Sequence, residues 1–71
     1  MISILKLARH QAGYHSQLAL AKELGINEKS ISAYETGRAQ VPTELAFKMA
    51  KLFNKPLEEL FPGRFGNEVL Q

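Results

Sequence analysis

A run of short and polar residues near the middle of the chain carries most of the side chains that could make specific hydrogen bonds. Glu28 and Lys29 bring a carboxylate and an ammonium group, and Ser30, Ser32 and Ala33 follow closely. Along the outside of a helix, these side chains would present donors and acceptors with no large apolar group among them. The chemistry that this segment predicts is recognition by hydrogen bonding rather than the making or breaking of bonds.

Groups suited to catalysis or metal binding are scarce in the rest of the chain. The 71 residues contain no cysteine and only two histidines, His10 and His15, with no acidic cluster beside them. Zinc sites need several such ligands at set spacings, and no nucleophile–base pair or glycine-rich phosphate loop is found. We therefore expect no enzyme, no cofactor and no metal site, and we expect both histidines to be exposed.

Length and composition describe one small domain. A 71-residue chain holds a single core, and an apolar fraction of 45% is typical of a folded globular chain. The net charge of +2 permits a nucleic-acid partner without requiring one. No apolar run suits a membrane span and no signal-peptide layout is found, so we expect a cytoplasmic protein with no membrane contact.

Apolar spacing and helix-ending residues predict an all-α fold. Leu20 and Ala21 fall on one helical face, and Gly25 follows as a stop. Pro42 suits the beginning of a helix, because its ring fixes φ and it lacks an N–H. Helices are expected over residues 3–12, 17–24, 28–35, 43–53 and 57–61.

The second and third predicted helices form a distinct pair. Ala21 is small, so the next helix can cross close above it, and Ile31 would fill the space between the two. Gly25 supplies a left-handed turn conformation at little cost. In a helix-turn-helix, one helix lies across the phosphate backbone of DNA and the other enters the major groove. The outer face of the third helix would then be the reading surface.

Four stretches at matching spacing carry a family resemblance: residues 16–26, 31–38, 48–53 and 57–61. The second of them holds an aromatic-Glu-x-Gly-basic run from Tyr34 to Arg38. With these stretches the chain resembles the lambda-repressor-like, Cro-type helix-turn-helix proteins, also called the XRE family. The resemblance implies a compact five-helix DNA-binding domain with the helix-turn-helix at its second and third helices. It also implies binding of double-stranded DNA as a homodimer on a near-palindrome.

The resemblance also assigns DNA contacts residue by residue. Lys29 would donate to guanine, Glu28 would accept from cytosine N4, and Ala33 would touch a thymine methyl group. Ser30 would share this base-facing side, and Gln17 would touch the backbone and the edge of a base. The remaining contacts, to phosphates, would come from Ser16, Asn27, Ser32, Thr36, Arg38 and Gln40.

Arg9 and Glu35 are expected to form a structural ion pair. Arg9 falls on an otherwise apolar face of the first predicted helix. The resemblance pairs it with Glu35, which would join the first helix to the third. Breaking one partner of a partly buried pair should cost more stability than breaking an exposed pair.

Apolar residues near both ends exceed what the inner helix faces need. The compact domain would take residues 1–62, with residues 63–71 as a C-terminal tail that could order on dimerisation. Two alternatives are open for the surplus: the tail folds back on its own domain, or the fifth helix and tail form a dimer interface. The surplus residues are Ile2, Ile4, Leu7, Phe61, Phe65, Val69 and Leu70.

The leading functional hypothesis is a sequence-specific transcriptional regulator, a repressor of phage, prophage or small bacterial type that occludes a promoter as a dimer. The alternative is an antitoxin or controller protein of a toxin or restriction system, which would also grip a protein partner. Five basic and three acidic residues lie within residues 1–43, so the positive excess falls in the half that holds the helix-turn-helix.

Overall fold

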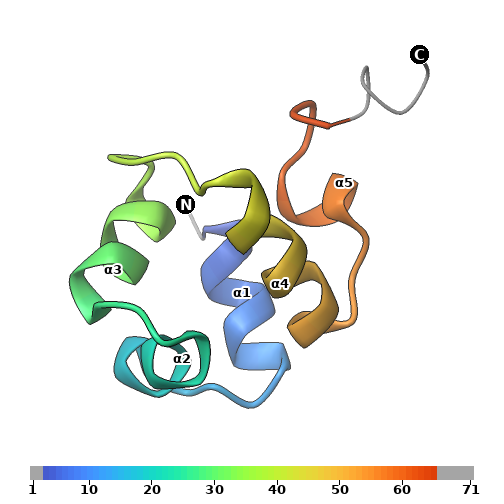
Figure 1. Ribbon diagram of the computed structural model, residues 1–71. Helices are drawn as coiled ribbons and strands as arrows, with labels where there is room; N and C mark the ends of the chain where they lie inside the picture. The colour runs from blue at the N-terminus through green and yellow to red at the C-terminus, as the bar shows by residue number, and fades with distance from the viewer. Residues whose placement is uncertain (1–2, 66–71) are drawn as a thin grey trace.

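The computed structural model describes residues 3–65 and contains five helices and no strand in that range. The helices are α1 (Ile4–Gln11), α2 (Gln17–Leu24), α3 (Glu28–Thr36), α4 (Thr43–Phe53) and α5 (Leu57–Leu60), as Figure 1 shows. The predicted all-α, five-helix architecture is confirmed. The bounds of α2 and α4 are those expected from the sequence, and the other helices differ by one residue at one or both ends.

Side-chain caps explain where the first three helices begin. Ser3, Ser16 and Asn27 stand just before α1, α2 and α3, and their side-chain oxygens accept from backbone N–H groups at 3.3, 3.0 and 2.8 Å. Such a cap satisfies one of the N–H groups that a helix start leaves unpaired. Ser3, expected inside the first helix, is therefore its cap, and Pro42 stands in the corresponding place before α4.

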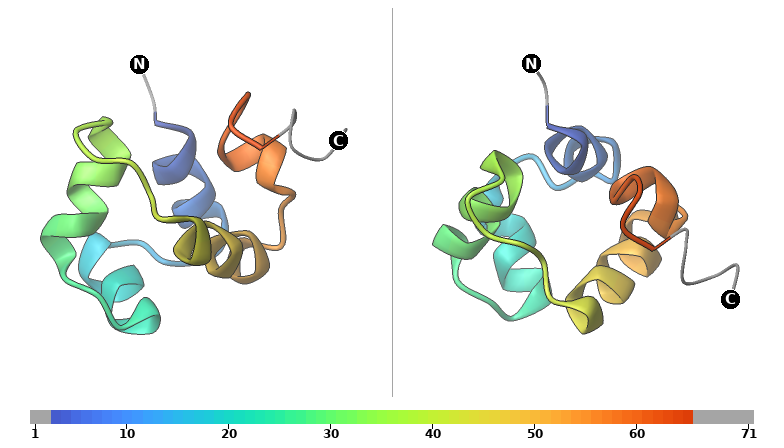
Figure 2. Two further views of the ribbon diagram at one scale, coloured as in Figure 1. Left: turned by 45° about the horizontal axis from the view of Figure 1, so that its top comes forward. Right: turned by 90° about the horizontal axis from the view of Figure 1, so that it is seen from above.

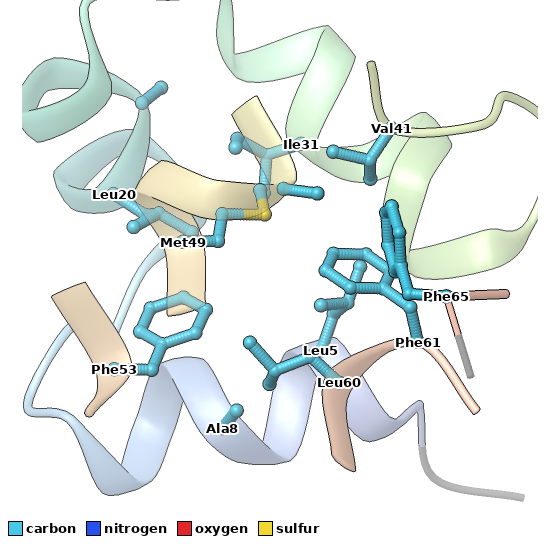
Figure 3. Close-up of a cluster of buried hydrophobic side chains, with 12 residues drawn as sticks. Leu5, Ala8, Leu20, Ile31, Val41, Met49, Phe53, Leu60, Phe61 and Phe65 are labelled. Atoms are coloured by element: carbon cyan, nitrogen blue, oxygen red, sulfur yellow. The ribbon is translucent and has the colours of Figure 1, made fainter. Parts of the chain in front are cut away.

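The helices surround one apolar core (Figure 3). Leu20 from α2, Ile31 from α3 and Met49 from α4 are the largest fully buried side chains. In Figure 2, the α2–α3 pair lies on one side of α1 and the α4–α5 pair on the other. The core between them thus fixes the helix-turn-helix against the rest of the domain.

The segment after α5 packs onto the domain. Phe61 and Phe65 are only 9% and 5% exposed, and both belong to the core (Figure 3). For these two rings the structure agrees with the alternative in which the segment folds back on its own domain, because the chain turns back after Pro62 and buries them. Ile4 and Leu7 are exposed on α1. The remaining residues of the apolar surplus, Ile2, Val69 and Leu70, lie outside the described residues.

Residues 3–65 provide neither a membrane span nor a cluster of metal ligands. Within that range, no helix combines the length and the apolar character that crossing a bilayer requires. The same residues hold no group of three or more side chains suited to a metal ion. His10 and His15 are exposed, as expected, with ring centroids 6.1 Å apart.

Candidate nucleic-acid interface

The turn between α2 and α3 begins at Gly25, which ends α2. Gly25 has a φ of 70°, in the left-handed region that favours glycine. The chain then hydrogen-bonds back onto α2, with Ile26 N–H donating to Ala21 O at 3.0 Å. Ala21 on α2 and Ile31 on α3 are each 1% exposed. A small side chain and a branched one therefore fill the space between the two helices. This packing turns the opposite face of α3 toward solvent.

Four of the predicted DNA contacts come together on that outer face. Lys29, Ser32, Ala33 and Arg38 line one hollow of the surface, of about 410 Å³. Lys29 and Arg38 are exposed, whereas Ser32 and Ala33 are half-buried. A hollow lined by two cations, a short hydroxyl and a methyl group suits an anionic partner with polar edges.

The Arg38 side chain is held in place at the end of α3. Its Nε donates to Thr36 Oγ1 at 3.1 Å, and its Nη2 donates to Ser32 Oγ at 3.4 Å. The Thr36 hydroxyl in turn donates to the carbonyl of Ser32 at 2.9 Å. Because the guanidinium is already oriented, less rotamer entropy is lost when it meets a phosphate.

The caps Ser16 and Asn27 have one polar group engaged and another free. Each side-chain oxygen accepts from a backbone N–H of its own helix, at Ala19 for Ser16 and at Lys29 for Asn27. The Ser16 hydroxyl proton and the Asn27 amide NH₂ make no side-chain hydrogen bond among residues 3–65. Both groups are donors, which is the kind of group that a phosphate oxygen accepts from.

Gln17 does not point freely outward, as a DNA contact alone would require. It is half-buried, and its Nε2 donates to Glu35 Oε1 at 2.9 Å. The other carboxylate oxygen, Glu35 Oε2, accepts from Arg9 Nε at 2.7 Å. Arg9 Nη1 also donates to the carbonyl of Tyr14 at 2.8 Å. One buried network therefore joins α1, α2, α3 and the loop between α1 and α2.

Burial gives this network its importance. The side chains of Arg9 and Glu35 are 3% and 5% exposed, so they form an ion pair shut off from water. A buried charge is tolerated only when its partner and its hydrogen bonds are in place. The family resemblance, together with an arginine on an apolar helix face, predicts the pairing of Arg9 with Glu35. The two bonds made with Gln17 and Tyr14 have no signal in the sequence.

Comparison with known proteins identifies the family to which this architecture belongs. A family model described as helix-turn-helix matches residues 5–60, which include all five helices except the first residue of α1. The chain belongs to the helix-turn-helix family. No solved structure matches the chain significantly.

Similar proteins come from several archaea. An uncharacterized HTH-type transcriptional regulator of Methanocaldococcus jannaschii is 41% identical over 46 residues, which are 65% of this chain and 70% of that protein. A putative HTH-type transcriptional regulatory protein of Pyrococcus horikoshii is 42% identical over 53 residues, or 75% of this chain. The match spans only 16% of the length of that second relative.

The remaining predicted contacts of this helix-turn-helix protein are spread more widely. Glu28 is exposed in the first turn of α3, and Ser30 is half-buried on the same helix. Gln40 is exposed, but it lines a different groove, next to Ser3 and Arg64 rather than Lys29. The structure therefore brings Lys29, Ser32, Ala33 and Arg38 together in one hollow, whereas Gln40 shares its groove with Thr36.

Proposed function

We propose that this protein is a transcriptional regulator that binds specific sequences of double-stranded DNA through the outer face of α3. The hollow formed by Lys29, Ser32, Ala33 and Arg38 carries the proposal, because it combines phosphate-binding cations with short side chains that can approach base edges. The printed names of the archaeal relatives, HTH-type transcriptional regulators, support the same role. The family match favours such a binding module over an enzyme.

In this proposal α3 enters the major groove. Lys29 donates to guanine, Glu28 accepts from cytosine, Ala33 meets a thymine methyl group, and Ser30 lies at the edge of the reading surface. Gln17 keeps one amide N–H on Glu35 and offers the second to the backbone. The phosphates are bound by Ser16, Asn27, Ser32, Thr36, Arg38 and Gln40.

The small number of cations at this surface favours binding as a homodimer. Lys29 and Arg38 are the two basic residues of the hollow, and the exposed carboxylate of Glu28 lies close to them in the sequence. Each phosphate contact adds only a modest, salt-dependent share of affinity. Two copies on half-sites about 34–36 Å apart would double the contacts on a near-palindromic operator. Occlusion of a promoter by such a dimer would make the protein a cytoplasmic repressor.

The alternative of an antitoxin or controller protein has less support. An antitoxin or controller protein would bind DNA and would also co-purify with a partner protein. The relatives named here are archaeal, so they lend no support to a phage or bacterial origin.

Selection of bound sequences from a random DNA pool tests the proposal. A regulator should enrich a near-palindrome, and Lys29→Ala should lose about 1–3 kcal/mol on that sequence while losing less on random DNA. Lys51→Ala is the matched control, since Lys51 is an exposed lysine on α4, away from the hollow. Equal affinity of the unaltered protein for enriched and random DNA would refute sequence-specific regulation.

A further inference from the structure

A groove of about 750 Å³ lies between α1 and the α2–α3 pair, which Figure 2 shows beside each other. Its walls come from three helices, so residues far apart in the sequence meet there. We name it the α1 groove, and it is lined by Lys6, Leu7, His10, Gln17, Glu35 and Thr36. Gln17 and Thr36 already belong to the proposed DNA contacts, whereas Lys6 and His10 have no role in them.

Lys6 and His10 place polar groups on one wall of the α1 groove. They are four residues apart on α1, a spacing that puts two side chains on one helix face. Both are exposed, and Lys6 takes part in no salt bridge among residues 3–65. An ammonium group carries three donors and an imidazole carries at least one. This wall is therefore suited to an anion that accepts several hydrogen bonds.

The acidic residue of the α1 groove does not oppose this charge. Glu35 is the one carboxylate among the described residues that line the groove, and its side chain is 5% exposed. Its Oε2 accepts from Arg9 Nε at 2.7 Å, and its Oε1 accepts from Gln17 Nε2 at 2.9 Å. Because Arg9 already compensates this carboxylate, Lys6 gives the groove a net positive charge.

Thr36 joins the α1 groove to the hollow that Lys29 and Arg38 line. It lines the groove, and its Oγ1 accepts from Arg38 Nε at 3.1 Å. Arg38 in turn lines the hollow on the outer face of α3. Groups that can bind an anionic partner therefore continue without a break from α3 to α1.

We propose that the α1 groove binds the phosphate backbone of DNA next to the half-site that α3 reads, with Lys6 and His10 as phosphate contacts. Each strand of a duplex carries one charge per about 3.4 Å of helix axis, so a strand bound at Arg38 presents further phosphates to a neighbouring cation. This inference rests on the proposed function, because it adds contacts to the same DNA. It extends the DNA-binding surface to a helix outside the helix-turn-helix.

The apolar edge of the groove favours a nucleic-acid backbone over a small anion. Leu7 is 48% exposed and lines the groove together with Lys6. A deoxyribose can cover an apolar side chain and remove its area from water, which is favourable, whereas inorganic phosphate has no apolar surface to offer. A partner in which sugars and phosphates alternate therefore matches both residues.

Salt titrations of DNA binding, followed by fluorescence anisotropy on the full chain, test the two contacts. Lys6→Ala should weaken binding of selected and random DNA by the same factor and reduce the slope of log K against log salt by about 0.9. His10→Ala should also weaken both DNAs, since a phosphate contact reads no base. Lys51→Ala is the matched control, because Lys51 is an exposed lysine on α4 that does not line the groove. An unaltered slope for Lys6→Ala, or unaltered affinity for His10→Ala, would overturn the proposal.

Neutral methylphosphonate groups, placed one at a time along the selected DNA, locate the Lys6 contact. The unaltered protein should lose affinity at one phosphate to which Lys6→Ala is insensitive, because that variant has no charge left to lose there. Arg38→Ala should become insensitive at a different phosphate. Insensitivity of both variants at the same phosphate, or no such position for Lys6→Ala, would show that the α1 groove adds no contact of its own.

Further outcomes separate a small-anion site and the proposed function from this inference. Inorganic phosphate, titrated at constant ionic strength, should displace DNA equally from the unaltered protein and from Lys6→Ala; displacement from the unaltered protein alone would assign the groove to a small anion. If the unaltered protein selects a DNA sequence and Lys6→Ala changes neither slope nor phosphate sensitivity, the groove proposal fails and the regulator stands. If the unaltered protein binds no DNA, the proposed function fails and this inference fails with it.

Discussion

Replacing Glu35 by glutamine offers the sharpest test of how the recognition helix is held. The change keeps the size of the side chain but removes its charge. In the native protein both carboxylate oxygens accept, one from Arg9 Nε at 2.7 Å and the other from Gln17 Nε2 at 2.9 Å. In the Glu35→Gln variant an NH₂ group takes one of those two places, so a donor faces a donor. The Arg9 charge is left buried and uncompensated.

The structure sets the size of the expected loss. The two side chains are 3% and 5% exposed, so solvent screens the pair little. Removing one partner of a buried ion pair costs about 3–5 kcal/mol. A domain of this length has a free energy of unfolding of roughly 4–11 kcal/mol. Since each kcal/mol shifts Tm by about 4–8 °C, Glu35→Gln should lower Tm by roughly 12–40 °C.

Thermal unfolding followed by circular dichroism measures this loss, and the chain provides its own control. Lys55 and Glu59 form an i,i+4 pair at 4.0 Å with side chains 31% and 61% exposed. Glu59→Gln should therefore lower Tm by less than about 4 °C. Replacing both charges, as Arg9→Met with Glu35→Leu, should recover part of the stability because no buried charge remains. A Glu35→Gln variant that melts within about 2 °C of the native protein would refute the reasoning.

Three further predictions concern the elements around this network. Gln17→Ala should lower the free energy of unfolding by about 1–3 kcal/mol in denaturant titrations, because Glu35 Oε1 loses its donor. An unchanged denaturation midpoint would show that this hydrogen bond does not stabilise the fold. Arg38→Ala should weaken specific and random DNA binding alike and reduce the slope of log K against log salt by about 0.9, and an unaltered slope would place Arg38 away from phosphate. Gly25→Ala should cost about 1–2 kcal/mol through its φ of 70° alone, since a Cβ there meets nothing within 4 Å; a much larger loss in Tm would point to a steric clash instead.

Local signals in the sequence were sufficient to predict most of the fold. Gly25 acts within a few residues of its own position, so its role in the turn could be predicted before any packing was known. The apolar spacing within α2 and α4 predicted their bounds for the same reason. The pairing of Arg9 with Glu35 was expected from an arginine on an apolar face together with the family resemblance.

Features that depend on distant contacts could not be predicted in the same way. A glutamine at the start of α2 can point toward solvent or toward α3, and only the approach of Glu35 decides that Gln17 turns inward. The burial of Phe65 depends on the turn after Pro62, where no helical period continues. Gln40 lies in a separate groove with Ser3 and Arg64, which follows from the path of the loop between α3 and α4.

The inner face of α3 holds the fold together, whereas its outer face is exposed to solvent. Ile31 and Glu35 face the interior, where packing and the ion network constrain them. Lys29 and Glu28 face outward and touch nothing that the fold requires. If α3 reads DNA as proposed, substitutions at the outer positions would change the operator that is bound while leaving the packing of Ile31 and Glu35 in place. Duplicated copies would then acquire separate sets of genes through a few surface changes.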